Sequence, residues 1–135
     1  MMLLLDASAI LAYLHDEPGA DQVAQALTSS IDCQATAANH AEAIAKCLDR
    51  GVAAEDVVPM LAELGYRVIG LTAEDGAVAG RMRAFTRPQG LSLGDRLCLA
   101  AAQRLDCPVL TADRTWLELA QALGLDIRCI RPDPQ

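Results

Sequence analysis

The chain has 135 residues, of which 53% are hydrophobic and 3% aromatic, and its formal net charge is −7. This length is typical of one domain around a single core, so we expect residues 1–135 to form one unit packed mainly by aliphatic and alanine side chains. The acidic balance argues against broad electrostatic capture of nucleic acid, which needs a basic surface, although it is compatible with a local basic groove.

The segments of the chain alternate between strand and helix signals. Short apolar runs bounded by turn residues predict buried strands, and apolar residues at helical spacing predict helices between them. In chain order we expect strand 2–5, helix 8–14, a helix from the break at 17–19 to about residue 27, strand 33–36, helix 38–48, helix 54–64, strand 66–71, helix 73–85, loop 87–90, helix 97–105, strand 109–111, helix 116–123 and strand 127–130. This alternation predicts an α/β fold with a central parallel sheet of about five strands and right-handed crossovers.

The cysteines and the N-terminal segment indicate the cellular compartment of the protein. The five cysteines are odd in number and form no Cys-x-x-Cys pair, and most lie in apolar stretches typical of buried, reduced thiols. With only His15 and His40 as imidazole ligands, we do not expect a zinc site. We find no basic leader and no apolar run long enough for a membrane span, so we expect a cytoplasmic protein without a membrane partner.

Four acidic residues stand where a parallel sheet would bring them together. Asp6 directly follows the first predicted strand, and Asp113 comes just after the strand at 109–111. The carboxyl ends of parallel strands share one edge of the sheet, and ligands bind there where the strand order reverses. Glu42 and Asp95 lie near the starts of helices that could face this edge. Clustered carboxylates repel each other unless a cation compensates them, and an all-oxygen cluster suits Mg²⁺ or Mn²⁺. The pattern therefore favours a metal-dependent enzyme acting on phosphate esters.

Polar neighbours accompany these acidic residues. Ser8 and Thr111 each stand two residues from an acidic position, and Asn39 stands one helical turn before Glu42. Such side chains can orient a carboxylate or a metal-bound water. An exposed polar position on the helix explains Asn39 equally well.

Each acidic residue taken singly also has a structural explanation. Asp6 and Asp113 are placed to cap the helix that follows, and Asp95 lies at capping-box spacing from Ser92. Glu42 precedes a lysine by four residues, a spacing that forms surface ion pairs. Only the joint pattern of the four residues points to a site.

The stretches 4–11, 39–42, 91–100 and 109–116 resemble the PIN-domain ribonucleases, and among them the VapC-type toxins of toxin–antitoxin pairs. The matching letters are LLDASAIL, NHAE, LSLGDRLCLA and VLTADRTW, and their order, their spacing and the chain length fit this family. The resemblance implies a three-layer PIN-like fold in which the strands that end at Asp6 and Asp113 are neighbours.

The resemblance also implies an activity, namely endonucleolytic cleavage of RNA by metal-activated water with Mg²⁺ or Mn²⁺ as cofactor. Asp6 and Asp95 are the first choices for direct ligands. The catalytic and metal-binding set that it implies is Asp6, Glu42, Asp95 and Asp113, supported by Ser8, Thr111 and Asn39.

Partners follow from the same resemblance. Arg96 and Arg114 each follow a candidate catalytic Asp and are expected to contact RNA phosphates, as are Lys46 and Arg50 beyond Glu42. For each of these cations a solvated charge or a local ion pair is the competing interpretation. An antitoxin protein and a homodimer are also implied, with the apolar helix at 54–64 as a candidate dimer face, although this helix is at least as well suited to packing on its own sheet.

Other functions compete with this interpretation. A haloacid-dehalogenase-like phosphatase would need a second Asp where Ser8 stands, and a receiver-like module would need an Asp after the strand near 68–71. A housekeeping RNA-processing nuclease and a PIN scaffold that does not cut stay open as alternatives.

Overall fold

The computed structural model describes residues 1–132 and has a five-stranded, fully parallel sheet at its centre. The strands are β1 (Met2–Leu5), β2 (Asp32–Thr36), β3 (Arg67–Ile69), β4 (Val109–Thr111) and β5 (Ile127–Cys129). Their order in the sheet is β3-β2-β1-β4-β5, so the chain winds outward from β1 in one direction and then returns to add β4 on its other side. The reversal lies between β1 and β4, where Leu4 pairs with Val109 and Leu5 with Leu110. The predicted α/β architecture is confirmed.

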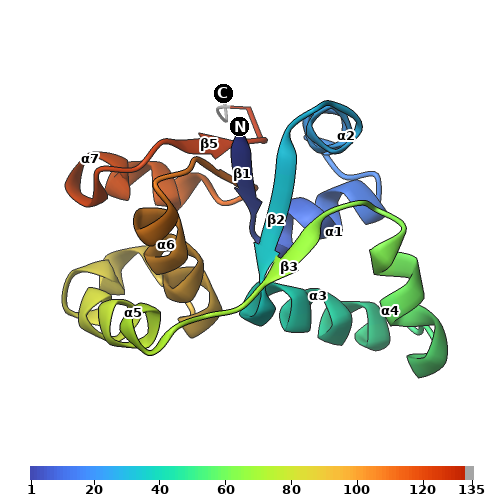
Figure 1. The fold of residues 1–135 in the computed structure, drawn as a ribbon, viewed down its shortest axis with the longest axis horizontal. Helices are drawn as coiled ribbons and strands as arrows, with labels where there is room; N and C mark the ends of the chain where they lie inside the picture. The colour runs from blue at the N-terminus through green and yellow to red at the C-terminus, as the bar shows by residue number, and fades with distance from the viewer. Residues whose placement is uncertain (133–135) are drawn as a thin grey trace.

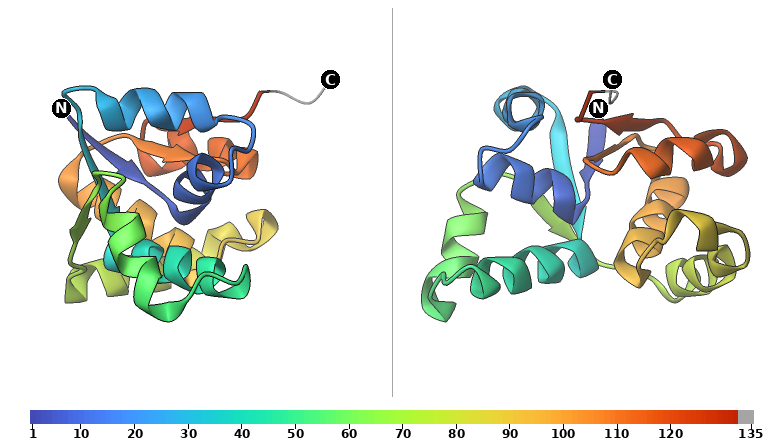
Figure 2. Two further views of the ribbon diagram at one scale, coloured as in Figure 1. Left: turned by 90° about the vertical axis from the view of Figure 1, so that its right-hand side faces the viewer. Right: turned by 180° about the vertical axis from the view of Figure 1, so that it is seen from behind.

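Helices cover both faces of the sheet (Figures 1 and 2). The first four helices lie on one face, and the later ones lie on the other. The first group is α1 (Ala7–Leu14), α2 (Ala20–Thr28), α3 (Ala37–Asp49) and α4 (Ala54–Ala62). The second group is α5 (Ala73–Thr86), the 3₁₀ turn η1 (Arg87–Gln89), α6 (Leu93–Leu105), the 3₁₀ helix η2 (Arg114–Leu119) and α7 (Ala120–Leu123).

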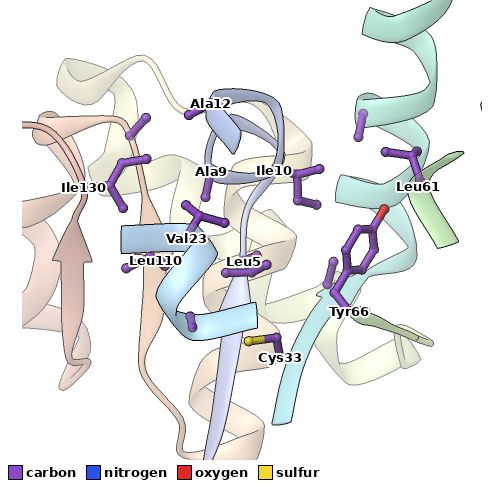
Figure 3. Packing of buried hydrophobic residues seen from close by; sticks show 14 of the residues in the cluster. Leu5, Ala9, Ile10, Ala12, Val23, Cys33, Leu61, Tyr66, Leu110 and Ile130 are labelled. Atoms are coloured by element: carbon purple, nitrogen blue, oxygen red, sulfur yellow. The ribbon is translucent and has the colours of Figure 1, made fainter. Parts of the chain in front are cut away.

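Two hydrophobic cores form because successive residues of a strand point to opposite faces. Leu3 and Leu5 of β1 pack with α1–α4, whereas Leu4 packs with α5, α6, η2 and α7. Figure 3 shows the first core, in which Leu5 and Leu110 of the two central strands lie close to Val23 of α2. Burying a side chain of this kind stabilises the fold by about 1.5–3 kcal/mol, so the central strands are held from both sides.

Some element boundaries differ from those predicted. Helix α6 begins at Leu93, four residues before the predicted start, because Ser92 and Asp95 form a reciprocal capping box. The Ser92 N–H donates to Asp95 Oδ2 over 2.9 Å, and the Asp95 N–H donates to Ser92 Oγ over 3.1 Å. The predicted strand at 66–71 is ordered as strand only over Arg67–Ile69, the helix at 116–123 is a 3₁₀ helix followed by one α-turn, and the loop at 87–90 contains η1.

Helix α4 packs against α3 and into the first core. Val57 and Leu61 are buried in the first core, while Val58 is 50% exposed. All five cysteines are free thiols, and four of them are buried. Across residues 1–132, none of the helices has both the length and the apolar character needed to cross a bilayer.

Two glycines with left-handed backbone give a matched test of packing at the C-terminal strand. Gly19 (φ +96°) and Gly51 (φ +95°) both strain any L side chain, at about 1–2 kcal/mol. A Cβ at Gly19 would also lie 2.6 Å from Ile130 Cγ1 and from the Ile130 carbonyl oxygen, whereas a Cβ at Gly51 meets nothing within 4 Å. We therefore expect Gly19→Ala to lower the free energy of unfolding clearly more than Gly51→Ala does, as measured by urea denaturation. Equal losses would show that Ile130 is not held against α2.

Candidate active site

Four carboxylates line one pocket at the carboxyl ends of β1 and β4. The pocket has a volume of about 180 Å³, and its acidic lining residues are Asp6, Glu42, Asp95 and Asp113. Asp6 follows β1, Glu42 lies in the second turn of α3, Asp95 lies in the first turn of α6, and Asp113 follows β4. The structure thus brings together the acidic residues that the sequence singled out, at the point where the strand order reverses. We call this the acidic pocket.

Asp6 is the most enclosed of the four, with only 2% of its surface exposed. Its Oδ1 accepts hydrogen bonds from the Ala9 N–H (2.8 Å) and from Ser8 Oγ (2.7 Å). Its Oδ2 accepts one from Thr111 Oγ1 (2.5 Å), across the β1–β4 junction. The bond from Ala9 also caps α1, so Asp6 acts as a helix cap and lines the acidic pocket as well.

Ser8 and Thr111 join the ends of the two central strands. Ser8 Oγ accepts from the Ala112 N–H (2.9 Å) and lies 3.3 Å from Thr111 Oγ1. Thr111 Oγ1 in turn accepts from the Asp113 N–H (3.1 Å). These two hydroxyls therefore fix the Asp6 carboxylate and the backbone that carries Asp113 in one network.

Glu42 is held through Asn39, which is fully buried. The Asn39 side-chain amide donates to Glu42 Oε1 (3.4 Å) and to the Gly94 carbonyl oxygen (3.5 Å). The Asn39 N–H donates to Thr36 Oγ1 (3.1 Å), which caps α3. Asn39 is thus a buried bridge between α3 and α6, not the exposed polar position considered for it above.

The environment of the acidic pocket disfavours the ionised forms of Asp6, Glu42 and Asp95. Burial raises the pKa of Asp6 to about 6, against the hydrogen bonds that lower it, and the charge of Asp95 adds to the rise. Burial also raises the pKa of Glu42, again with a contribution from Asp95. Burial and then Asp113 raise the pKa of Asp95, while hydrogen bonds from Ser92 oppose the rise. Asp95 therefore interacts with each of the other three carboxylates.

The donor set of the acidic pocket fits a hard divalent cation. All four candidate ligands offer carboxylate oxygens, and a cation would offset both the burial and the mutual repulsion that raise the pKa values of Asp6, Glu42 and Asp95. Within residues 1–132, no three acidic, imidazole or thiol groups are already close enough to enclose an ion. Mg²⁺ is commonly bound through one or two protein carboxylates together with several waters.

A second depression of about 480 Å³ adjoins the acidic pocket and shares Ser8, Leu11, Lys46 and Asp113 with it. We call it the basic groove. The cations that line it are Lys46, Arg50, Arg114 and Arg131. They make up four of the 11 Lys and Arg residues of a chain whose net charge is −7. Glu17, which pairs with Arg131 over 3.8 Å, and Asp113 line the same groove, so its cations outnumber its carboxylates by four to two.

The predicted phosphate contacts fall into two groups. Arg114, Lys46 and Arg50 line the basic groove, as a substrate contact requires. Arg96 does not reach either depression; it is only 9% exposed and donates to the Ala79 carbonyl oxygen of α5 over 2.9 Å. Arg96 has the environment of a residue that packs α6 on α5, so we do not retain it as a substrate contact.

Two residues of the site were missed from the sequence. Gly94 lies against Glu42, and only its position one residue before Asp95 could have drawn attention to it. Arg131 lines the basic groove because β5 pairs with β4, and nothing in the Pro-rich segment around it indicates this.

Comparison with known proteins identifies one family and several similar structures. The PIN domain model matches residues 3–122. VapBC-1 from nontypeable Haemophilus influenzae superimposes with a TM-score of 0.70 at 18% identity, over 96% of this chain and 98% of that chain. VapBC2 from Rickettsia felis, bound to a DNA fragment from its promoter, gives 0.70 at 14% identity over 96% and 98%. VapBC-5 from Mycobacterium tuberculosis, a member of the VapBC family of toxin–antitoxin systems, gives 0.59 at 19% over 97% and 98%. No curated protein matches.

The raised pKa of Asp6 predicts a pH-dependent stability. Between its ordinary value of 3.8 and about 6, folded Asp6 keeps a proton that the unfolded chain loses, so the free energy of unfolding falls as the pH rises through this window. The difference of about 2 pKa units corresponds to about 3 kcal/mol. In EDTA, Asp6→Asn should therefore be more stable than the wild type at pH 7.5 by up to about 3 kcal/mol, and similar to it at pH 4, in urea denaturation. A variant that is less stable at pH 7.5 would contradict the desolvation of Asp6.

Proposed function

Because this chain belongs to the PIN-domain family, whose members are generally nucleases, we propose that it is a Mg²⁺- or Mn²⁺-dependent endoribonuclease and the toxin of a VapBC-type toxin–antitoxin pair. The observation that carries this proposal is the acidic pocket, where four carboxylates share about 180 Å³ at the reversal point of the sheet. Repulsion among these carboxylates is reduced when a cation binds.

The proposed roles follow from the contacts of each side chain. Asp6 and Asp95 would hold the cation, since Asp6 is fixed by three hydrogen bonds and Asp95 interacts electrostatically with all the other carboxylates. Glu42 and Asp113 line the same pocket and add to its negative charge. A bound divalent cation supplies hydroxide near neutral pH and neutralises phosphodiester oxygens.

The proposed substrate is RNA held by its backbone. Lys46, Arg50 and Arg114 line the basic groove, which opens directly into the acidic pocket. Phosphates on one side of the scissile bond would lie along these cations while the scissile phosphate lies over the carboxylates. In-line attack of a water on phosphorus would form a new P–O bond and break the bond to the 3′ oxygen. The water would lose a proton and the 3′ oxygen would take one up, leaving a 5′ phosphate and a 3′ hydroxyl. With 3% aromatic residues, the chain offers little surface for base stacking, so recognition would depend on backbone and shape.

An antitoxin and a second copy of the chain are the proposed protein partners. Support for the antitoxin is the similarity to VapBC structures, which at 14–19% identity is a similarity of fold. For the homodimer, Val58 of α4 and Val68 of β3 are 50% and 44% exposed and line one depression of about 250 Å³. This depression is a candidate contact for the second copy.

The nuclease is tested by incubating the purified chain with a labelled single-stranded RNA pool in Mn²⁺, Mg²⁺ or EDTA. We expect cleavage that requires the metal and falls by at least a factor of about 100 in Asp95→Asn. The loss of a ligand weakens binding of the cation, and it is the cation that activates water. Circular dichroism of the variant should be unchanged. Cleavage that persists in EDTA or in the variant would exclude the acidic pocket as the catalytic centre.

Phosphate contacts in the basic groove predict a salt-dependent affinity. In EDTA, where no cleavage occurs, Arg50→Gln should reduce the slope of log affinity against log salt concentration by about 0.7 for single-stranded RNA. The matched control is Arg83→Gln, which removes an exposed arginine of α5 outside the groove. Fluorescence anisotropy measures both slopes. Equal changes in the two variants would mean that RNA binding is not localised to the groove.

A further inference from the structure

Gly94 lies against the carboxylate of Glu42. A Cβ built on Gly94 would overlap Glu42 Oε1 and lie 2.7 Å from Glu42 Cδ and 3.5 Å from Oε2. No other helix glycine has such a neighbour, since a Cβ at Gly76 or Gly80 of α5 meets nothing within 4 Å. The carboxylate of Glu42 therefore occupies the space that any other side chain at position 94 would fill.

The backbone does not explain the glycine. Gly94 is the second residue of α6 and is not among the glycines with positive φ, so alanine could adopt its conformation without strain. Glycine is moreover less favourable than alanine within a helix. The space for Glu42 is the remaining physical reason for glycine at this position.

A buried amide holds the carboxylate in that space. Asn39 donates to Glu42 Oε1 and to the Gly94 carbonyl oxygen, so it binds both partners of the close approach. Asn39 is itself anchored by Thr36, which donates to Asn39 Oδ1 over 3.2 Å. The close approach of α3 to α6 thus depends on the hydrogen bonds of Asn39 and on the absence of a side chain at Gly94.

We infer that Gly94 is a positioning residue, whose missing side chain sets where the Glu42 carboxylate stands relative to Asp95 in the acidic pocket. This inference rests on the proposed function for its consequence in catalysis. Its geometry does not depend on that function. The obstacle that a Cβ would meet is the end of a flexible side chain, so Glu42 would turn aside while the helices stay in place.

The test is Gly94→Ala, with Gly80→Ala as the matched control. Both variants place alanine at a helical glycine, so both should unfold at an equal or higher urea concentration than the wild type. Only Gly94→Ala should weaken Mn²⁺ binding, by about 10–100-fold in calorimetry, as is typical when a group that orients a ligand is lost. A stable fold combined with weakened metal binding is a result that a purely structural role would not give. Mn²⁺ affinity equal to that of Gly80→Ala would overturn the inference.

A rescue variant isolates the steric cause. Glu42→Asp shortens the side chain by one methylene, so its carboxylate clears an alanine at position 94. We expect Glu42→Asp to weaken Mn²⁺ binding in the wild type, but to weaken it less, or to restore it, in the Gly94→Ala background. Strictly additive losses would contradict a direct contact between the two positions.

A metal-free measurement separates this inference from the proposed function. In EDTA, the side-chain carboxyl carbon resonances of Glu42 should shift in Gly94→Ala and stay in place in Gly80→Ala, because only the first variant displaces the Glu42 carboxylate. Shifted resonances in a protein that neither binds Mn²⁺ nor cuts RNA would uphold the positioning role and reject the nuclease. Unshifted resonances would overturn the positioning role, whatever the protein cuts.

Discussion

A buried carboxylate at the junction of β1 and β4 ties the pairing of the central strands to the geometry of the acidic pocket. Asp6 is only 2% exposed at the end of β1, and three donors that reach its carboxylate favour its ionised form. One of these donors, Thr111, comes from the neighbouring strand, so the register of the central strands and the geometry of the site are one requirement. A slip of one residue would turn Thr111 away and leave a buried charge without its partner.

Much of this arrangement could be predicted from the sequence because parallel strands place their carboxyl ends together. Asp6 and Asp113 follow apolar runs, so the predicted α/β fold is sufficient to place both residues at one edge of the sheet. The sequence did not indicate the direction of Arg96, because adjacent residues of a helix point about 100° apart: while Asp95 faces the acidic pocket, Arg96 faces α5. The sequence did not point to Arg131 or Gly94, because their positions in the site depend on neighbours from other elements. No local sequence pattern indicates such neighbours.

The distribution of charge explains how an acidic chain is compatible with a polyanionic substrate. The net charge of −7 describes the average surface, whereas a substrate responds to the charges within about 10 Å of its path, beyond which salt screens them. Lys46 lines both the acidic pocket and the basic groove, so cationic and anionic surfaces meet at one side chain. Global acidity is therefore weak evidence about binding when a few cations are gathered along one groove.

The sequence distance between the two central strands has a consequence for biosynthesis. Asp6 and its partner Thr111 are 105 residues apart, and β4 is the fourth of five strands to be made. A ribosome that has translated the chain as far as Ile69 has produced β1, β2 and β3, with the helices that cover one face, but nothing to pair with the other edge of β1. The nascent chain therefore carries Asp6 without the neighbours that complete the site until β4 has been made, and the acidic pocket can assemble only after that point.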